Sequence, residues 1–312
     1  MTREAEIAVR QIAQPDFSGR LSELLRTAFA VTDYTASFPH IFSPSSAARK
    51  FAAFDPNENI IACCAVDTEI WSEPQYLRGG CIGSVAVDPK FQRRGFGRRL
   101  LTEVISQLRA EESHDFLYLF SDQPEFYESL GFRRAGTEIL SSFSVVDPQP
   151  DGQHIFRQPL LTTVLGEDEK VRLWRAFERG RLRGESSSSF AKFCQVLEIP
   201  EMCVSWIEDS QRQIAAGVFV GKGVDFRGVA HSFFAENSQE LDAFLRYFRR
   251  YTEASGVVLQ IAAGLRSGEM SASFSQISRQ DLCLVYGLTL ATEVVVGHFE
   301  DGKIYPRALF SS

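Results

Sequence analysis

Two glycines and four arginines lie together where an apolar run gives way to a helical pattern. The apolar run ends with Val85-Ala86-Val87, because the proline of Asp88-Pro89 cannot donate to a sheet ladder and should end a strand there. The junction that follows consists of Gln92, Arg93, Arg94, Gly95, Phe96, Gly97, Arg98 and Arg99. Glycine lets the backbone approach an anion closely, and the N–H groups and dipole of a helix start attract one. These residue types therefore predict a phosphate-binding loop.

The spacing of the glycines separates three kinds of phosphate loop. A dinucleotide-binding G-x-G-x-x-G pattern is excluded because Leu100 stands at the third glycine position, and no Walker run of the form G-x-x-x-x-G-K-S/T occurs. The pattern that remains is Q-x-x-G-x-G, carried by Gln92, Gly95 and Gly97. The competing interpretation is a plain turn followed by a solvated helix start. Four arginines around two glycines favour phosphate binding over that interpretation.

At these residues the sequence resembles the GNAT superfamily of acyl-CoA-dependent N-acyltransferases. The family signature Q/R-x-x-G-x-G/A falls on residues 92–97, and the family helix F-Y-x-x-x-G-F falls on Phe126–Phe132. One helix and one strand fit between them, as in the family, and the resemblance covers the first half of the chain. It implies acetyl-CoA as co-substrate, held by the strand end and the junction. The residues concerned are Val85, Ala86, Val87, Gln92, Arg93, Arg94, Gly95, Phe96, Gly97 and Arg98.

The resemblance also implies how the reaction proceeds. The amine acceptor must lose a proton, the oxyanion needs a hydrogen-bond donor, and the departing thiolate benefits from a proton. Tyr127 matches the family tyrosine that points at the sulfur and is expected to be the general acid, with a core tyrosine as the alternative. No Ser/His/Asp or Cys/His grouping indicates a covalent enzyme intermediate, so direct attack in a ternary complex is expected. The general base stays open among four carboxylates chosen by location only, Asp33, Glu69, Glu73 and Asp122.

The elements that must position these residues alternate between strand and helix. We expect strands at residues 7–12, 50–54, 60–71, 81–87, 116–120 and 137–146. We expect a helix capped by Asp16 or Ser18, one that follows the glycine junction, and one from Asp122 to Gly131. Residues 32–44 are typical of a loop. Parallel central strands in this order predict an α/β fold with a mixed sheet, which the resemblance identifies as the acyl-CoA N-acyltransferase fold.

A proline-rich linker at residues 147–152 predicts two domains, at 1–147 and 153–312. Beyond it the element order repeats, which we interpret as a degenerate second copy of the fold, with an unrelated α/β domain as the alternative. Its strand-to-helix junction at His231–Ser238 contains Glu236 and neither glycine nor arginine, so we expect no CoA site there. The expected strands are at 155–165, 202–207, 214–220, 224–234, 257–261 and 292–299, and the expected helices begin near 168, 187, 237 and 279.

The composition narrows the class of protein. The 312 residues carry a net charge of −7, which argues against a nucleic-acid-binding surface. The six cysteines form no C-x-x-C pair and the five histidines are scattered, so we expect free thiols, no metal site and a cytoplasmic location. The charged N-terminus lacks the apolar core of a signal peptide, and no apolar run is long enough to span a bilayer.

These features together predict an N-acetyltransferase for an amine of a small molecule or peptide, acting without nucleic acid, membrane or metal. A non-catalytic acyl-CoA-binding sensor is the alternative from another class of protein. A transferase that modifies tRNA or protein is a third hypothesis. The net charge of −7 argues against a tRNA substrate. The identity of the amine acceptor, the acyl chain and a homodimeric state stay open.

Overall fold

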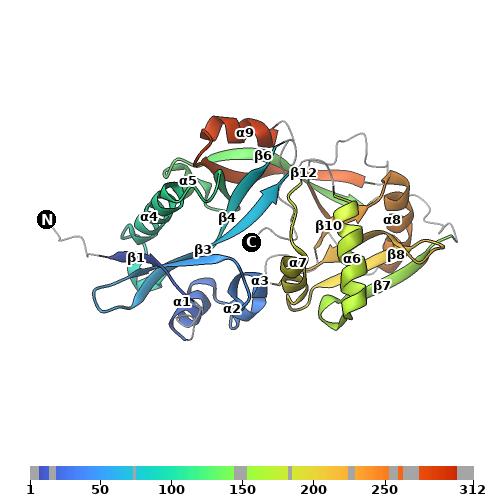
Figure 1. Cartoon of the computed structure of the whole chain (residues 1–312), viewed down its shortest axis with the longest axis horizontal. Helices are drawn as coiled ribbons and strands as arrows, with labels where there is room; N and C mark the ends of the chain where they lie inside the picture. The colour runs from blue at the N-terminus through green and yellow to red at the C-terminus, as the bar shows by residue number, and fades with distance from the viewer. Residues whose placement is uncertain are drawn as a thin grey trace. The chain divides into compact units, whose positions relative to one another are not determined.

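The computed structural model describes residues 7–13, 19–72, 75–143, 153–181, 185–223, 229–252, 259–262 and 274–300 (Figure 1). These residues form two compact units. Unit 1 contains the described residues up to Ala135 together with Cys283–His298, and unit 2 contains those of Gly136–Leu282 with Phe299 and Glu300. Neither unit is therefore continuous in sequence. The expected linker at 147–152 lies outside the described residues, and the domain boundary drawn there stays a prediction.

Unit 1 is built on a mixed sheet, as the sequence predicts. Its strands are β1 (Ala8–Gln11), β2 (Arg49–Phe54), β3 (Ile60–Trp71), β4 (Leu77–Val87), β5 (Phe116–Leu119) and the end of β12 (Phe274–Gly287). They lie in the order β1-β2-β3-β4-β5-β12. The neighbours β4 and β5 run parallel, and the other neighbours in this order run antiparallel. The α/β fold class with a mixed sheet is thus confirmed.

Helices cover both faces of this sheet. On one face, α4 (Phe96–Ala110) buries the apolar stripe that the sequence predicts, Leu100, Leu101, Val104, Ile105 and Leu108. On the other face lie α1 (Arg20–Phe29), α2 (Tyr34–Ser37) and α3 (Pro39–Phe42). Alternate residues of β3 face the two layers, so that Cys64 packs in the α4 layer and Cys63 in the α1 layer. Within residues 62–66 of β3, even-numbered residues therefore face α4, and odd-numbered residues face α1.

Unit 2 has a similar arrangement. Its strands are β6 (Arg133–Phe143), β7 (Ile155–Leu161), β8 (Cys203–Glu208), β9 (Ile214–Val220), β10 (Ala230–Ala235) and β11 (Leu259–Ala262). They lie in the order β6-β11-β10-β9-β8-β7, with β10 and β11 parallel and the other neighbours antiparallel. One core cluster packs under α6 (Glu167–Arg179) and α7 (Phe190–Leu197), and another packs under α8 (Ser238–Thr252).

Two strands contribute residues to both units. β6 begins in unit 1 at Arg133 and pairs with β11 of unit 2 through Glu138–Ser141. β12 begins in unit 2 and pairs antiparallel with β5 of unit 1 through Leu284–Gly287. After β12 the chain forms α9 (Thr292–Glu300), most of which belongs to unit 1. The strand of unit 1 beyond β5 therefore comes from the far end of the described chain.

The local pattern of apolar and polar residues predicts most of the described helices and strands. Its predictions for residues 279–299 are wrong. The strands expected at 60–71 and 214–220 are confirmed with the same bounds by β3 and β9. The helix expected near 279–286 is wrong, because these residues lie in β12, whose pairing with β5 is non-local. The strand expected at 292–299 is wrong, because it forms α9 despite three consecutive valines, which are typical of strands. The loop expected at 32–44 contains α2 and α3.

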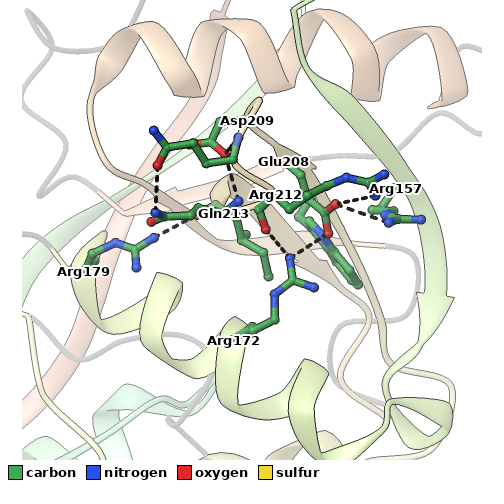
Figure 2. A network of polar contacts seen from close by, with 10 residues as sticks. Arg157, Arg172, Arg179, Glu208, Asp209, Arg212 and Gln213 are labelled. Atoms are coloured by element: carbon green, nitrogen blue, oxygen red, sulfur yellow. Dashed lines mark hydrogen bonds and ion pairs between the residues drawn. The ribbon is translucent and has the colours of Figure 1, made fainter.

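A buried carboxylate ties together three elements of unit 2 (Figure 2). Glu208, at the end of β8, has a side chain that is 1% exposed. Its oxygens accept hydrogen bonds from Trp206 Nε1 (3.2 Å), Arg172 of α6 (2.9 Å) and Arg157 of β7 (3.2 Å), and Arg212 lies 3.8 Å away. Burial opposes ionisation of Glu208, but these donors outweigh it and lower the pKa of the carboxyl group.

Candidate functional site

The strands β4 and β5 separate beyond a short parallel ladder. Within the described residues the ladder consists of three pairs, from Gly79–Phe116 to Cys81–Tyr118. β4 continues past this ladder to Val87. The backbone of Val85–Val87 is therefore not used by β5, and such an edge can pair with an extended, amide-containing ligand. This is the strand end that, according to the family resemblance, is expected to hold acetyl-CoA.

A bulge in β4 lies at the start of that edge. The register between β3 and β4 shifts between Cys63 and Ala65. Across from the shift, Ser84 has a φ of 53°, in the left-handed region that serine rarely adopts. Its hydroxyl lies 3.1 Å from the hydroxyl of Tyr34 in α2. A bulge bends its strand, which accounts for the separation of β4 from β5, and strained backbone of this kind concentrates at functional sites.

The glycine junction forms a tight loop between β4 and α4. Gly95 is the N-cap of α4, with φ 82° and ψ 0°, and no described side chain caps the first turn of this helix. Gln92 Nε2 donates to the Val87 carbonyl (3.2 Å), which holds the loop against the end of β4. A Cβ on Gly97 would lie 3.3 Å from Val87 Cγ2, so the helix start packs closely on the strand. The helix N–H groups and the positive end of its dipole are the parts of an anion site.

The arginines of the junction have different surroundings. Arg93 has a φ of 57° and is exposed, as is Arg94. The Arg94 guanidinium lies over the rings of Phe91 and Phe96, 5.4 Å from each centroid, a cation–π arrangement that orders its stem. The exposed guanidinium groups place positive charge beside the loop, as the sequence predicts.

Arg98 connects the loop to the helix that carries Tyr127. This helix, α5, spans Pro124–Glu128, and the chain leaves it through Gly131, which has a φ of 97°. The Arg98 guanidinium donates to the carbonyl (2.9 Å) and the hydroxyl (2.6 Å) of Ser129, directly after α5. Arg98 therefore fixes the end of α5 relative to the first turn of α4, in addition to adding charge beside the loop.

Tyr127 lies in the α4 layer of unit 1. Its side chain is 9% exposed, and its ring packs against Phe126 (4.9 Å between centroids) and Phe132 (6.0 Å). Burial, reinforced by the nearby Cys64 thiol and only partly opposed by the Ser121 hydroxyl, raises the pKa of Tyr127 to about 12. The phenol therefore keeps its proton at neutral pH. A protonated phenol can donate a hydrogen bond to a thiolate that forms beside it.

The four carboxylates considered as general bases are placed very differently. Asp122 is near Tyr127 and contributes to its raised pKa. Asp122 is not the N-cap of α5, as expected from the sequence, because that position belongs to Gln123, whose N–H donates to Ser121 Oγ (3.0 Å). Asp33 is exposed at the start of α2, and Glu73 lies outside the described residues. The general base stays open.

Glu69 lies on the sheet face opposite Tyr127, in a buried polar cluster that sequence reasoning missed. Burial and the Glu69 carboxylate raise the pKa of Tyr118 well above its usual value. In the same layer, burial lowers the pKa of Lys50 to about 8, and Asp67 partly opposes that shift. The available signal was the alternation of acidic residues with apolar ones in β3, which puts Asp67 and Glu69 on one face.

Among the described residues, no group of three or more His, Cys, Asp or Glu side chains could hold a metal ion. The six cysteines are free thiols. In the same residues, no helix has the length and apolarity needed to cross a bilayer.

Comparison with known proteins finds one family model that matches part of this chain. Residues 48–134 match the family model described as an acetyltransferase (GNAT) domain. That segment contains the β4 edge, the glycine junction and α5, so the match and the geometry fall on the same residues. The chain matches no curated protein.

Solved structures with this fold are distant in sequence. A probable N-acyltransferase from Enterococcus faecalis is 13% identical, with a TM-score of 0.67 over 92% of this chain and 74% of that one. A GCN5-related N-acetyltransferase from Anabaena variabilis is 11% identical, with a TM-score of 0.70 over 93% and 75% of the two chains. A tandem GNAT protein from the clavulanic acid biosynthesis pathway is 13% identical, with a TM-score of 0.55 over 92% and 100%. At such identities the likeness establishes the fold alone.

The fold is that of the acyl-CoA N-acyltransferases. The match to the GNAT domain model is confined to residues 48–134.

Proposed function

We propose that unit 1 transfers an acetyl group from acetyl-CoA to an amine of a small molecule or peptide, by direct attack in a ternary complex. The observation that carries this proposal is one hydrogen bond, from Gln92 to the Val87 carbonyl. It holds the β4 edge and the start of α4 next to each other. On one side lies the β4 edge that β5 does not use, and on the other lies the α4 start at Gly95. An extended amide chain that ends in a diphosphate has the shape to occupy both.

Each part of the proposed site has a distinct role. The backbone of Val85–Val87 pairs with the pantetheine arm, and the loop at residues 92–97 surrounds the diphosphate. Arg93, Arg94 and Arg98 add positive charge beside it. Tyr127 keeps its proton and donates a hydrogen bond to the sulfur as the C–S bond of the thioester breaks. The identity of the base that deprotonates the amine is not part of the proposal.

Unit 2 is, we propose, a degenerate second copy that does not bind CoA. In support, β10 has a register shift between His231 and Phe234, and Ser232 there has a φ of 52°, close to that of Ser84 in β4. Both strands also have a parallel neighbour, β5 or β11. The helix start differs, because Asn237 Oδ1 already accepts the N–H of Glu240 (3.0 Å) at the beginning of α8. This capped and acidic helix start is unsuited to a diphosphate.

Thiol release from acetyl-CoA, measured with a panel of small amines and peptides, tests the proposed function. Turnover with any amine supports it. Tight binding of acetyl-CoA without turnover across the panel would instead support a sensor, and the absence of binding would contradict both. The cytoplasmic location stays a prediction that this assay does not address.

The loop itself is tested by Gly97→Leu. We expect acetyl-CoA affinity to fall at least about 100-fold, since a side chain there would push against Val87 Cγ2 and Phe126 and displace the helix start from the strand. The matched control is Gly297→Leu in α9, where a Cβ would meet nothing within 4 Å. Isothermal titration calorimetry gives both affinities. Equal affinities in the two variants would exclude the loop as the binding site.

A further inference from the structure

The sheet of unit 1 is completed by a strand from the opposite end of the chain. Four residue pairs join Leu284–Gly287 of β12 to Phe116–Leu119 of β5. Val285 is fully buried and Leu284 is 4% exposed. On its other side, β5 has only the three ladder pairs with β4 among the described residues. β12 therefore supplies at least half of the strand pairing that holds β5 in place.

The side chain of Tyr286 links β12 to the segment that follows α5. Its ring lies 5.2 Å from the ring of Phe132, centroid to centroid, and a Cβ on Gly131 would lie only 3.1 Å from its Cε2 atom. Phe132 in turn donates its N–H to the carbonyl of Tyr127 (3.2 Å) and packs on the tyrosine ring. The ring of Tyr286 thus packs against Gly131 and Phe132, which follow the helix that carries Tyr127.

Further bonds hold the same segment in position. Arg109 of α4 donates to the Tyr286 hydroxyl (2.9 Å), although the two residues are 177 positions apart in sequence. At the start of β5, the Asp115 carbonyl accepts the N–H groups of Leu288 (3.0 Å) and Thr289 (3.2 Å). The Asp115 carboxylate accepts the Thr289 hydroxyl (2.8 Å). These bonds leave little freedom for the chain on either side of the Tyr286 ring.

We infer that Cys283–Thr289 is a structural part of the acyl-transfer site, and that Tyr286 is a positioning residue for Tyr127. The ring of Tyr286 prevents α5 from moving away from the sheet, so the Tyr127 hydroxyl stays in the buried place where it keeps its proton. The catalytic consequence rests on the proposed function of unit 1. The positioning of α5 does not, and can be measured without turnover.

Full-length Tyr286→Ala, Tyr286→Leu and Tyr286→Phe test this inference by hydrogen–deuterium exchange of the segment 123–132. We expect exchange to be at least about tenfold faster than in the wild type for Tyr286→Ala, because loss of the ring frees the end of α5 to open locally. Tyr286→Leu keeps apolar volume and serves if the alanine variant does not fold. Tyr286→Phe keeps the ring and should exchange within twofold of the wild type, as should Val294→Ala, a control at an exposed position of α9.

Kinetics supply the second measurement. For Tyr286→Ala we expect kcat to fall about 10- to 100-fold while the KM for acetyl-CoA changes less than twofold, because the Tyr286 ring packs against Gly131 and Phe132 and its loss disturbs the alignment of Tyr127. Tyr286→Phe should restore kcat to near the wild-type value.

The outcomes separate this inference from the proposed function. Unchanged exchange at 123–132 in folded Tyr286→Ala and Tyr286→Leu overturns it, and so does a loss in Tyr286→Phe equal to that in Tyr286→Ala. A wild-type protein that turns over no amine refutes the proposed function alone. In that case faster exchange in Tyr286→Ala still supports the positioning of α5 by the distant strand.

Discussion

At the scale of single residues, the burial of Tyr127 decides what this side chain can contribute. Its pKa of about 12 lies above that of an ordinary thiol, which is about 8.5. Full transfer of its proton to a free thiolate would therefore be unfavourable by about 5 kcal/mol. In the proposed reaction, a hydrogen bond to the sulfur as negative charge develops there would have no such cost, and it would stabilise the transition state more than the bound thioester.

The variant Tyr127→Phe tests this role. We expect kcat to fall about 100-fold while the KM for acetyl-CoA stays within twofold, since the ring and its packing remain and only the donor is lost. Because the pKa is raised, the donor is fully present at neutral pH and is lost only as the pH rises towards 12. The matched control is Tyr247→Phe in unit 2, which removes a hydroxyl bonded to the His154 carbonyl. An unchanged kcat in Tyr127→Phe would remove the proposed role.

At the scale of secondary-structure elements, a single backbone irregularity organises the site. Ser84 bends β4, and the same irregularity recurs at Ser232 in β10. The sequence could not reveal either bulge, because serine is neither a strand breaker nor a residue that favours positive φ. It did reveal the helix start after β4, because glycine, proline and charge act locally there. Patterns in the sequence thus locate the glycine loop. They do not reveal that β4 and β5 separate beside it, which leaves the Val85–Val87 edge unused by β5.

The Glu208 cluster is an element-scale contact with a measurable effect on stability. We expect Glu208→Gln to lower the free energy of unfolding at pH 7 by about 2 kcal/mol, because the hydrogen bonds that join β7, α6 and β8 lose their charge. Urea unfolding measures this difference. The matched control Glu167→Gln removes a largely exposed partner of Lys170 and should cost less than about 0.5 kcal/mol.

The pH dependence of the Glu208 contribution has a defined sign. The folded-state pKa is lowered, so this stabilisation is present above the unfolded value of about 4.3 and is lost as the pH falls below it. The difference between wild type and Glu208→Gln should therefore shrink between pH 7 and pH 3. A constant difference over that interval would mean that the carboxylate charge is not what stabilises the cluster.

At the scale of the whole molecule, the proposed function predicts one acetyl-CoA per chain. The α4 start is open to an anion, whereas the α8 start is capped by Asn237 and lies beside Glu236, which pairs with Arg179 at 2.8 Å. Calorimetric titration of the full chain should give a stoichiometry of one, and Gly97→Leu should abolish it. Asn237→Ala is the control and should bind normally. Two sites, or residual tight binding in Gly97→Leu, would show that unit 2 also takes the cofactor.

The mixed sheet, the α4 stripe and the glycine loop could be predicted from the sequence because each depends on residues close together in the chain. The end of the chain could not be. Residues 279–286 carry a helix-like mixture of polar and apolar side chains. They nevertheless lie in β12, whose last residues, Leu284–Gly287, pair with β5, far away in sequence. The ring of Tyr286 packs against Gly131 and Phe132, which follow α5, and no local pattern in the sequence predicts this contact.

The sharing of β6 and β12 between the units has a practical consequence for gene design. A fragment cut at any one peptide bond near residue 147 would leave the first half without the strand that borders β5. Shortened versions should instead splice Cys283–His298 behind Ala135 through a synthetic connection. When the two halves are varied in a library, β6 and β12 should be exchanged together or both left unchanged, because each contributes residues to both units.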